Sequence, residues 1–207
     1  MVAPRSGRKA IVYLHGFVSA PQSRKATMLG DYVRNCVGGL EYVVPALHHR
    51  PAQAMRQVEE ACRPYAAHDL TLVGSSLGGF YATVAAERLG CRAALLNPAV
   101  HPHRHFARYL GPQRNLYTGE EFDLTMEHVD ELAALDVPVI TKPSRYWLFV
   151  ETGDEVLDYR EAVAFYAGAC QTVVRGGDHA LTSFPEHVPE LVDWAMGEAH
   201  GGAREAS

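Results

Sequence analysis

Three side chains of this sequence have the types and the chain order that nucleophilic catalysis by a serine needs. Ser76 lies at the centre of the run GSSLG at 74–78, which matches the pattern G-x-S-x-G. Asp154 and His179 follow, so the order is serine, acid, histidine. In such a set the histidine takes the proton of the serine hydroxyl, and the acid holds the imidazole in the required tautomer. We therefore predict Ser76 as nucleophile, His179 as general base and Asp154 as orienting acid.

The run at 74–78 lies in the local context that a sharp nucleophile turn needs. Residues 70–74 are apolar and β-prone, and residues 80–89 are compatible with a helix. The turn between them requires small neighbours two residues on either side of the serine, and both are glycines. The pattern alone is weak, because an ordinary glycine-rich turn with a serine also matches it. The strand, turn and helix context favours the functional interpretation of Ser76, whereas Ser75 is interpreted as structural.

Backbone N–H groups close to this turn are candidates for stabilising an oxyanion. The apolar run 9–14 is followed by His15, Gly16 and Phe17, and the glycine permits a close approach of the backbone to a bound molecule. We predict the N–H groups of Phe17 and Leu77 as the oxyanion hole. An ordinary tight turn is the alternative for this loop. His15 precedes the serine in the chain and is interpreted as a structural hydrogen-bonding residue.

Two nearby aspartates compete for the role of the acid. Asp154 follows Gly153 at a turn beyond the apolar run 146–150. Asp158 directly precedes a predicted helix, and capping a helix N-terminus is a frequent role of aspartate. This division favours Asp154 as the acid and leaves Asp158 as the alternative. Asp178 is disfavoured, because it adjoins the histidine and successive residues usually point apart.

Apolar runs that alternate with helical patterns must position these residues. The predicted strands are 9–14, 41–44, 70–74, 92–96, 146–150 and 171–174. The predicted helices are 23–36, 51–67, 80–89, 126–135, 158–169 and 184–196, and 99–124 is predicted to be irregular. Such alternation is typical of a mostly parallel sheet with helices on both faces. In sheets of this kind the chemistry lies beyond the carboxyl ends of the strands.

Composition limits the class of protein. A length of 207 residues predicts one domain over 1–207, with 1–8 and 198–207 as flexible tails. A net charge of −5 argues against nucleic-acid binding. No apolar run reaches the length of a membrane span or forms a secretory signal, so a cytoplasmic protein is expected. The four cysteines lack metal-binding or redox spacing and are expected to be free thiols.

Several segments together resemble one family. They are YLHGF at 13–17, GSSLGGFYAT at 74–83, NPAV at 97–100, YTG at 117–119, TGDEVLDYR at 152–160 and GGDHA at 176–180. With them the chain resembles the small YqiA-like esterases of the α/β-hydrolase superfamily, from about Ile11 to Trp194. Two positions depart from the family pattern: Val18, where a polar residue is expected, and Asp178, where asparagine is expected.

The resemblance implies an α/β-hydrolase fold with a minimal cap or none, and esterase activity on simple acyl esters and thioesters. We predict a serine hydrolase that cleaves carboxylic esters of short to medium acyl chains through an acyl-enzyme on Ser76, without a metal or organic cofactor. The expected partner is a small acyl ester or thioester. The alternatives are an acyl-CoA thioesterase, favoured if Arg104, Arg108 and Arg114 lie at the mouth of the site, and a non-catalytic ligand-binding protein of the same fold.

A histidine-rich segment offers a competing interpretation. His101, His103 and His105 alternate, and on a strand they would share one face as metal ligands. The surrounding prolines favour a loop instead. Aromatic residues close by, Phe106, Tyr109 and Tyr117, could form a small flap over the nucleophile. His48 and His49 lie in another predicted loop and either line the site or are simply exposed.

Overall fold

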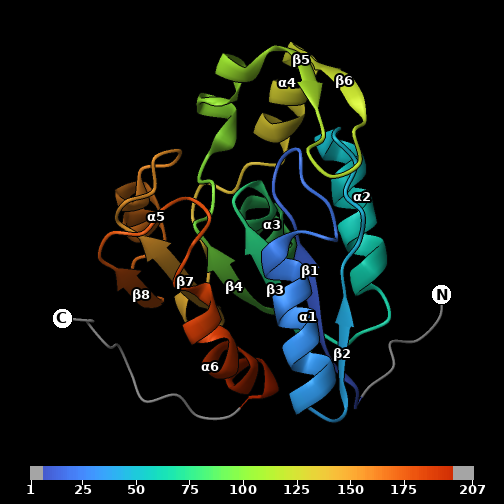
Figure 1. The fold of residues 1–207 in the computed structure, drawn as a ribbon, viewed down its shortest axis with the longest axis vertical. Coiled ribbons are helices and arrows are strands. Elements are labelled where there is room, and N and C mark those ends of the chain that lie inside the picture. Colours follow the sequence, from blue (N-terminus) through green and yellow to red (C-terminus); the bar gives the residue numbers. More distant parts are fainter. Residues whose placement is uncertain (1–6, 198–207) are drawn as a thin grey trace.

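A parallel sheet forms the centre of the computed structural model, which describes residues 7–197 (Figure 1). Its strands have the order β2-β1-β3-β4-β7-β8, and every neighbouring pair is parallel. The strands are β1 (Lys9–Leu14), β2 (Leu40–Val43), β3 (Leu70–Ser75), β4 (Arg92–Leu96), β7 (Tyr146–Glu151) and β8 (Cys170–Val174). Because all of them are parallel, their carboxyl ends meet at one edge, where the predicted site residues follow them.

Helices bury both faces of this sheet. Helices α1 (Arg24–Cys36) and α6 (Phe184–Met196) pack on one face, where they enclose Ile11 and Tyr13 of β1. Helices α2 (Pro51–Cys62), α3 (Leu77–Leu89) and α5 (Tyr159–Phe165) pack on the other face, with Val12 and Leu14. Consecutive residues of β1 thus face opposite cores, as the pleat requires. Burial on both faces explains why these strands are continuous apolar runs in the sequence.

The segment between β4 and β7 differs from the predicted irregular stretch at 99–124. It contains two short 3-10 helices, Pro102–Arg104 and Phe106–Tyr109, and an antiparallel hairpin of β5 (Gly111–Arg114) and β6 (Glu121–Leu124). The hairpin and helix α4 (Met126–Ala134) lie together at one end of the molecule (Figure 1). The prediction missed the hairpin because its strands are short, mostly polar and include Pro112, so they lack an apolar alternation.

Some predicted boundaries were also wrong. The helix predicted over 51–67 ends at Cys62, because Pro64 cannot continue a helix. The helix predicted to begin at Phe80 begins at Leu77. Of the segments predicted as flexible tails, 1–6 and 198–207 lie outside the described residues. Gly7, by contrast, donates its N–H to the Asp69 carboxylate at 3.0 Å.

Candidate active site

Ser76 occupies a strained turn between β3 and α3. Its φ of 54° and ψ of −121° lie in a region that residues with a Cβ rarely adopt. The turn is held by backbone hydrogen bonds, since the Ser76 N–H donates to the Leu96 carbonyl at 3.0 Å. The Ser76 carbonyl accepts from the N–H groups of Gly79 and Ala99 at 2.9 and 3.0 Å. The surrounding backbone therefore stabilises a conformation that an isolated serine would avoid.

Two glycines make this turn possible. A Cβ at Gly74 would lie 2.3 Å from the Gly78 carbonyl oxygen, and a Cβ at Gly78 would lie 2.0 Å from the Leu14 carbonyl oxygen. Both contacts are with backbone atoms, which cannot rotate away. The glycines of the G-x-S-x-G pattern thus allow β1, β3 and α3 to approach each other closely around the serine.

Replacing Gly78 with alanine should prevent stable folding. The added methyl group would press on the Leu14 carbonyl in the centre of the sheet. Overpacking typically costs about 1–3 kcal/mol and sometimes more, and a clash with backbone atoms, which cannot rotate away, belongs at the upper end. We expect a large loss of folded protein in urea unfolding followed by circular dichroism. Gly38→Ala is the control, because a Cβ there meets no heavy atom within 4 Å. Equal stability of the two variants would contradict this account of the turn.

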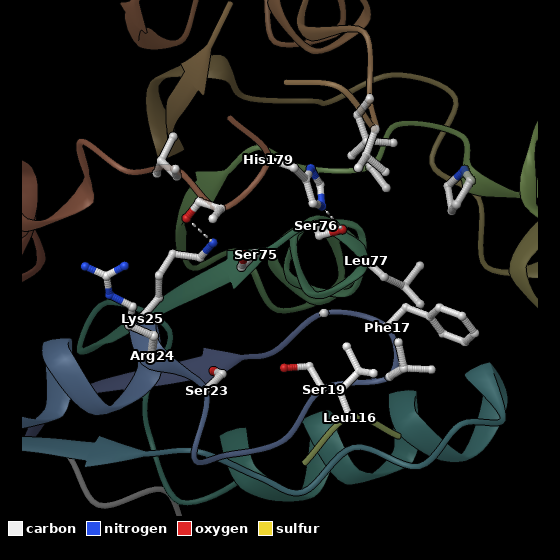
Figure 2. Close-up of a pocket in the computed structure, with 18 of the residues that line it drawn as sticks. Phe17, Ser19, Ser23, Arg24, Lys25, Ser75, Ser76, Leu77, Leu116 and His179 are labelled. Atoms are coloured by element: carbon white, nitrogen blue, oxygen red, sulfur yellow. Dashed lines mark hydrogen bonds between the residues drawn. The ribbon is translucent and has the colours of Figure 1, made fainter. Parts of the chain in front are cut away.

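The structure brings Ser76, His179 and Asp154 into one hydrogen-bonded chain. The distance from His179 Nε2 to Ser76 Oγ is 3.1 Å (Figure 2). The distances from His179 Nδ1 to the two carboxylate oxygens of Asp154 are 3.0 and 2.9 Å. The side chain of Asp154 is 1 % exposed and that of His179 is 24 % exposed. An Nδ1–H that donates to the carboxylate leaves Nε2 unprotonated and facing the serine hydroxyl, as a general base requires.

Hydrogen bonds from His179 and from the neighbouring backbone favour the ionised form of Asp154. Burial raises the pKa of this carboxyl, but hydrogen bonds from His179 and from the N–H groups of Leu157 and Val156 outweigh burial and hold the pKa below its ordinary value. Asp158, the alternative acid, accepts a hydrogen bond from the Arg160 N–H and caps α5. The geometry therefore favours Asp154 over Asp158 as the partner of His179.

The lowered pKa of Asp154 makes its contribution to stability dependent on pH. The folded state holds this proton more weakly than the unfolded state, so the contribution is present above the ordinary pKa of 3.8 and is lost as pH falls through the lower folded value. We expect the free energy of unfolding to fall more steeply in wild type than in Asp154→Asn as pH drops below about 5. Urea titrations at a series of pH values would measure both slopes, and equal slopes would contradict the prediction.

A cavity of about 630 Å³ opens over Ser76 and His179. Phe17 and Leu77 line it, and neither of their backbone N–H groups donates a hydrogen bond to another described residue. Leu77 is the first residue of α3, where N–H groups have no partner within the helix. Two unpaired donors beside the serine are consistent with the predicted oxyanion hole.

One side of this cavity is aromatic and aliphatic. The ring of Phe17 packs against Phe106 at 4.9 Å and against Phe122 at 6.1 Å between ring centroids. Three residues that were predicted to form a flap, Phe106, Tyr109 and Tyr117, all line the cavity. Their movement as a flap stays a prediction. Leu116 also lines the cavity and is 80 % exposed, so apolar surface continues to the rim.

The opposite side of the cavity is basic, and the sequence analysis missed it. Arg24 and Lys25, from the start of α1, lie on the other side of Ser76 from Phe17 (Figure 2). Lys25 donates to the Ala180 carbonyl at 2.7 Å. Burial lowers the pKa of its ammonium to about 8, against the opposing effect of nearby carboxylates. In the sequence, the only indication that Arg24 and Lys25 lie at the site is that they directly follow the loop after the first strand.

Of the three arginines predicted at the mouth, only Arg108 is among the residues lining this cavity. Arg104 lines a separate hollow beside α5, and Arg114 ends strand β5. Val18 and Asp178, the two departures from the family pattern, are both near the site. Val18 has a φ of 47°, which is strained for a β-branched residue.

The other predicted histidines have structural partners. His15 Nε2 accepts the Leu47 N–H at 3.0 Å, in agreement with its structural interpretation. His49 is hydrogen-bonded to His128 of α4 at 3.0 Å. His101 Nδ1 lies 2.8 Å from the carboxylate of Asp136. The metal alternative for 101–105 required a strand, whereas 3-10 helices occupy the segment, and residues 7–197 contain no group of three or more potential ligands placed to hold a metal ion.

Comparison with known proteins identifies the family. The model of the "Uncharacterised protein family (UPF0227)" matches residues 10–196. The chain belongs to this family. UPF0227 is the YqiA-like family, so the resemblance drawn from the sequence is confirmed.

Solved structures show how this UPF0227 chain relates to known folds. It is similar to a putative hydrolase from Agrobacterium vitis, with a TM-score of 0.71 at 16 % identity over 94 % of this chain and 90 % of the other. It is similar to mouse alpha/beta hydrolase domain-containing protein 10, with a TM-score of 0.68 at 15 % identity over 93 % of this chain and 92 % of the other. It is also similar to an esterase domain from Rhodothermus marinus, with a TM-score of 0.61 at 17 % identity over 93 % of this chain and 89 % of the other. The predicted α/β-hydrolase fold is therefore confirmed.

None of the helices within 7–197 of this UPF0227 chain combines the length and the apolar character needed to cross a bilayer.

Proposed function

We propose that this protein is a serine hydrolase that cleaves carboxylic esters of short to medium acyl chains. The hydrogen-bonded chain from Ser76 Oγ through His179 to the buried Asp154 carboxylate is the observation that carries the proposal. Membership of the YqiA-like family and a fold shared with hydrolases support it. We propose that it works in the cytoplasm as one domain and needs no cofactor.

The proposed reaction proceeds through an acyl-enzyme. Ser76 Oγ attacks the ester carbonyl carbon while His179 Nε2 accepts the hydroxyl proton. The N–H groups of Phe17 and Leu77 stabilise the resulting oxyanion, each by about 3–4 kcal/mol in the transition state. The C–O bond to the alcohol then breaks, and the alcohol leaves with the proton from His179. Water, activated by His179, attacks the acyl-enzyme and releases the acid.

The two sides of the cavity suit the two halves of such a substrate. The leaving alcohol must meet His179 Nε2, which donates its proton. Ala180 and Lys25 adjoin His179 in the cavity, so we assign the basic side to the alcohol. We assign the aromatic side around Phe17 to the acyl chain, whose burial there is favourable at about 25 cal/mol per Å².

Labelling with a fluorophosphonate tests the proposed nucleophile directly. The reagent phosphonylates a serine only where a base and an oxyanion site activate it. We expect one equivalent to react, with the mass increase on the peptide that contains Ser76, and p-nitrophenyl butyrate to be hydrolysed by unlabelled protein only. Absence of both labelling and turnover would favour the alternative of a non-catalytic ligand-binding protein.

An acyl-CoA thioesterase is a second candidate. The observation that favours it is that Arg24, Lys25 and Arg108 line the cavity, together with Glu155 and Glu161, and these cations could bind phosphate groups of a leaving thiol. The ratio of kcat/KM for butyryl-CoA to kcat/KM for p-nitrophenyl butyrate distinguishes the two. A ratio well above one would favour the thioesterase.

A further inference from the structure

We propose that Glu151 is a positioning residue, which holds the loop that carries His179 so that the imidazole stays aligned with Ser76. The inference rests on the proposed function and extends it to a residue outside the serine, histidine and aspartate set. Glu151 is the last residue of β7 and is 0 % exposed. Strand β7 pairs with β8, and the loop 176–183 follows β8. The Glu151 carboxylate is hydrogen-bonded to this loop.

The Glu151 carboxylate binds this loop on both sides of His179. One oxygen, Oε2, accepts the N–H of Asp178 at 2.7 Å and the N–H of Thr182 at 3.1 Å. The other, Oε1, accepts the N–H of Ser183 at 2.7 Å. A single side chain thus accepts three backbone N–H groups of this loop. These N–H groups are partly buried, so loss of their shared acceptor would leave them incompletely paired.

The loop lies on the carboxylate so closely that a glycine is required. Gly177 has a φ of 70°, and a Cβ there would lie 1.9 Å from Glu151 Oε2. Of the two glycines at 176 and 177, it is Gly177 that this contact requires. Gly177 allows the backbone to approach the carboxylate in the left-handed region.

Neighbouring side chains complete the support of the loop. Asn97, directly after β4, accepts the Glu151 N–H through Oδ1 at 3.0 Å. Its Nδ2 group donates to the carbonyl oxygens of Asp178 and His179 at 3.0 and 3.3 Å. Lys25 donates to the next carbonyl, that of Ala180. Glu151 accepts the N–H groups of Asp178, Thr182 and Ser183, and Asn97 donates to two of the carbonyls. The N–H of His179 itself donates to Glu155 Oε2 at 3.0 Å, in the turn after β7. The backbone around His179 is therefore held by side chains from the ends of two adjacent strands and the turn that follows one of them.

The role of Glu151 requires a carboxylate rather than an amide. Burial raises the pKa of the Glu151 carboxyl, but hydrogen bonds from Ser183, Asp178 and Thr182 outweigh it, and the net pKa is lowered. The group is therefore an ionised acceptor surrounded by donors. A glutamine would place an NH₂ group against one of these N–H groups and leave that donor unpaired.

Misalignment of His179 should reduce turnover more than substrate binding, because Glu151 does not line the cavity and the aromatic side around Phe17 and Phe106, which we assign to the acyl chain, lies on other segments. A displacement of reacting groups by about 1 Å can cost about 100-fold in rate. We expect Glu151→Gln to lower kcat for p-nitrophenyl butyrate about 10- to 100-fold, with KM within about threefold of wild type.

Glu87→Gln is the matched control. Glu87 is also a mostly buried carboxylate with a lowered pKa, and it accepts hydrogen bonds from the N–H and the hydroxyl of Thr141. It lies in α3, away from the cavity over Ser76. We expect its replacement to reduce thermal stability while kcat stays within about twofold of wild type.

Gly177→Ala is the second variant, in case Glu151→Gln folds poorly. Gly177 is exposed, and the three heavy atoms nearest to an added Cβ all belong to the Glu151 side chain, at 1.9, 2.2 and 2.8 Å. The methyl group should push the Glu151 carboxylate away from the loop, with added strain from the positive φ of Gly177, and lower kcat in the same way. The proposal is overturned if a folded Glu151→Gln or Gly177→Ala protein keeps kcat within twofold of wild type. It is also overturned if Glu87→Gln loses as much kcat as Glu151→Gln.

A spectroscopic measurement separates this inference from the proposed function. The proton between His179 Nδ1 and Asp154 should give a downfield proton NMR signal, assigned by its absence in Asp154→Asn. We expect Glu151→Gln to shift or broaden this signal and Glu87→Gln to leave it unchanged. If wild type hydrolyses no ester but the signal responds in this way, the positioning role stands and the proposed hydrolysis fails. An unchanged signal in Glu151→Gln overturns the positioning role.

Discussion

Replacement of Ser76 with alanine should lower kcat/KM for p-nitrophenyl butyrate by about 10⁴- to 10⁶-fold. The substitution removes the only hydroxyl that His179 Nε2 contacts in the described part of the chain, at 3.1 Å, and with it the acyl-enzyme route. Any remaining rate would come from the oxyanion donors and from binding. Initial rates at a series of ester concentrations, followed at the absorbance of p-nitrophenolate, would measure the loss.

Ser75→Ala provides a control for Ser76→Ala. Ser75 is the last residue of β3, is buried and lines the same cavity, but it is not bonded to His179. We expect this variant to retain activity within about tenfold of wild type, since the nucleophile is unchanged. If Ser76→Ala were as active as wild type, the proposed mechanism would be wrong, and the histidine-rich segment 101–105 would be the next place to search.

Replacement of Asp154 with asparagine should lower kcat by about 10⁴-fold while the protein stays folded. An asparagine amide can face His179 Nδ1 with its NH₂ group, which favours the tautomer with the proton on Nε2. That tautomer cannot accept the proton of the Ser76 hydroxyl. Stopped assays at high enzyme concentration would measure the residual kcat, and circular dichroism would confirm the fold.

Asp158→Asn separates catalysis from helix capping. Asp158 accepts the Arg160 N–H at 3.0 Å, a bond that asparagine can also accept. We expect kcat to stay within about twofold and stability to fall by less than about 1 kcal/mol. A collapse of activity in Asp158→Asn, together with an active Asp154→Asn, would assign the acid four residues further along the chain.

The sequence was sufficient to predict the parts of the fold that follow simple patterns. Strands such as 146–150 are buried on both faces, so they are strongly apolar and easy to recognise. The grouping of Ser76, Asp154 and His179 followed from chain order, because residues at the carboxyl ends of parallel strands meet at one edge. The structure brings these three together, and their catalytic roles stay predictions.

Other features depend on contacts that leave little trace in the sequence. The hairpin at 111–124 has no apolar alternation, and its formation depends on contacts such as that of Asn115 Nδ2 with the Ser19 carbonyl. Glu151 ends an apolar run and was passed over beside Asp154, although the residue is fully buried in the folded protein. The partners of Glu151 lie about 30 residues away, so only the folded chain shows what it binds.

The segment between β4 and β7 is a long connection between two neighbouring strands, so its length and sequence can vary without changing the sheet. It leaves the sheet after Leu96 and returns at Tyr146, on two strands that pair directly with each other. Insertions and deletions within it can therefore accumulate during evolution without changing the strand order or the register of the sheet. This same segment supplies Phe106 and Tyr109 to the aromatic side of the cavity, which we assign to the acyl chain. If that assignment holds, changes within the segment can alter substrate range while the serine, histidine and aspartate stay in place.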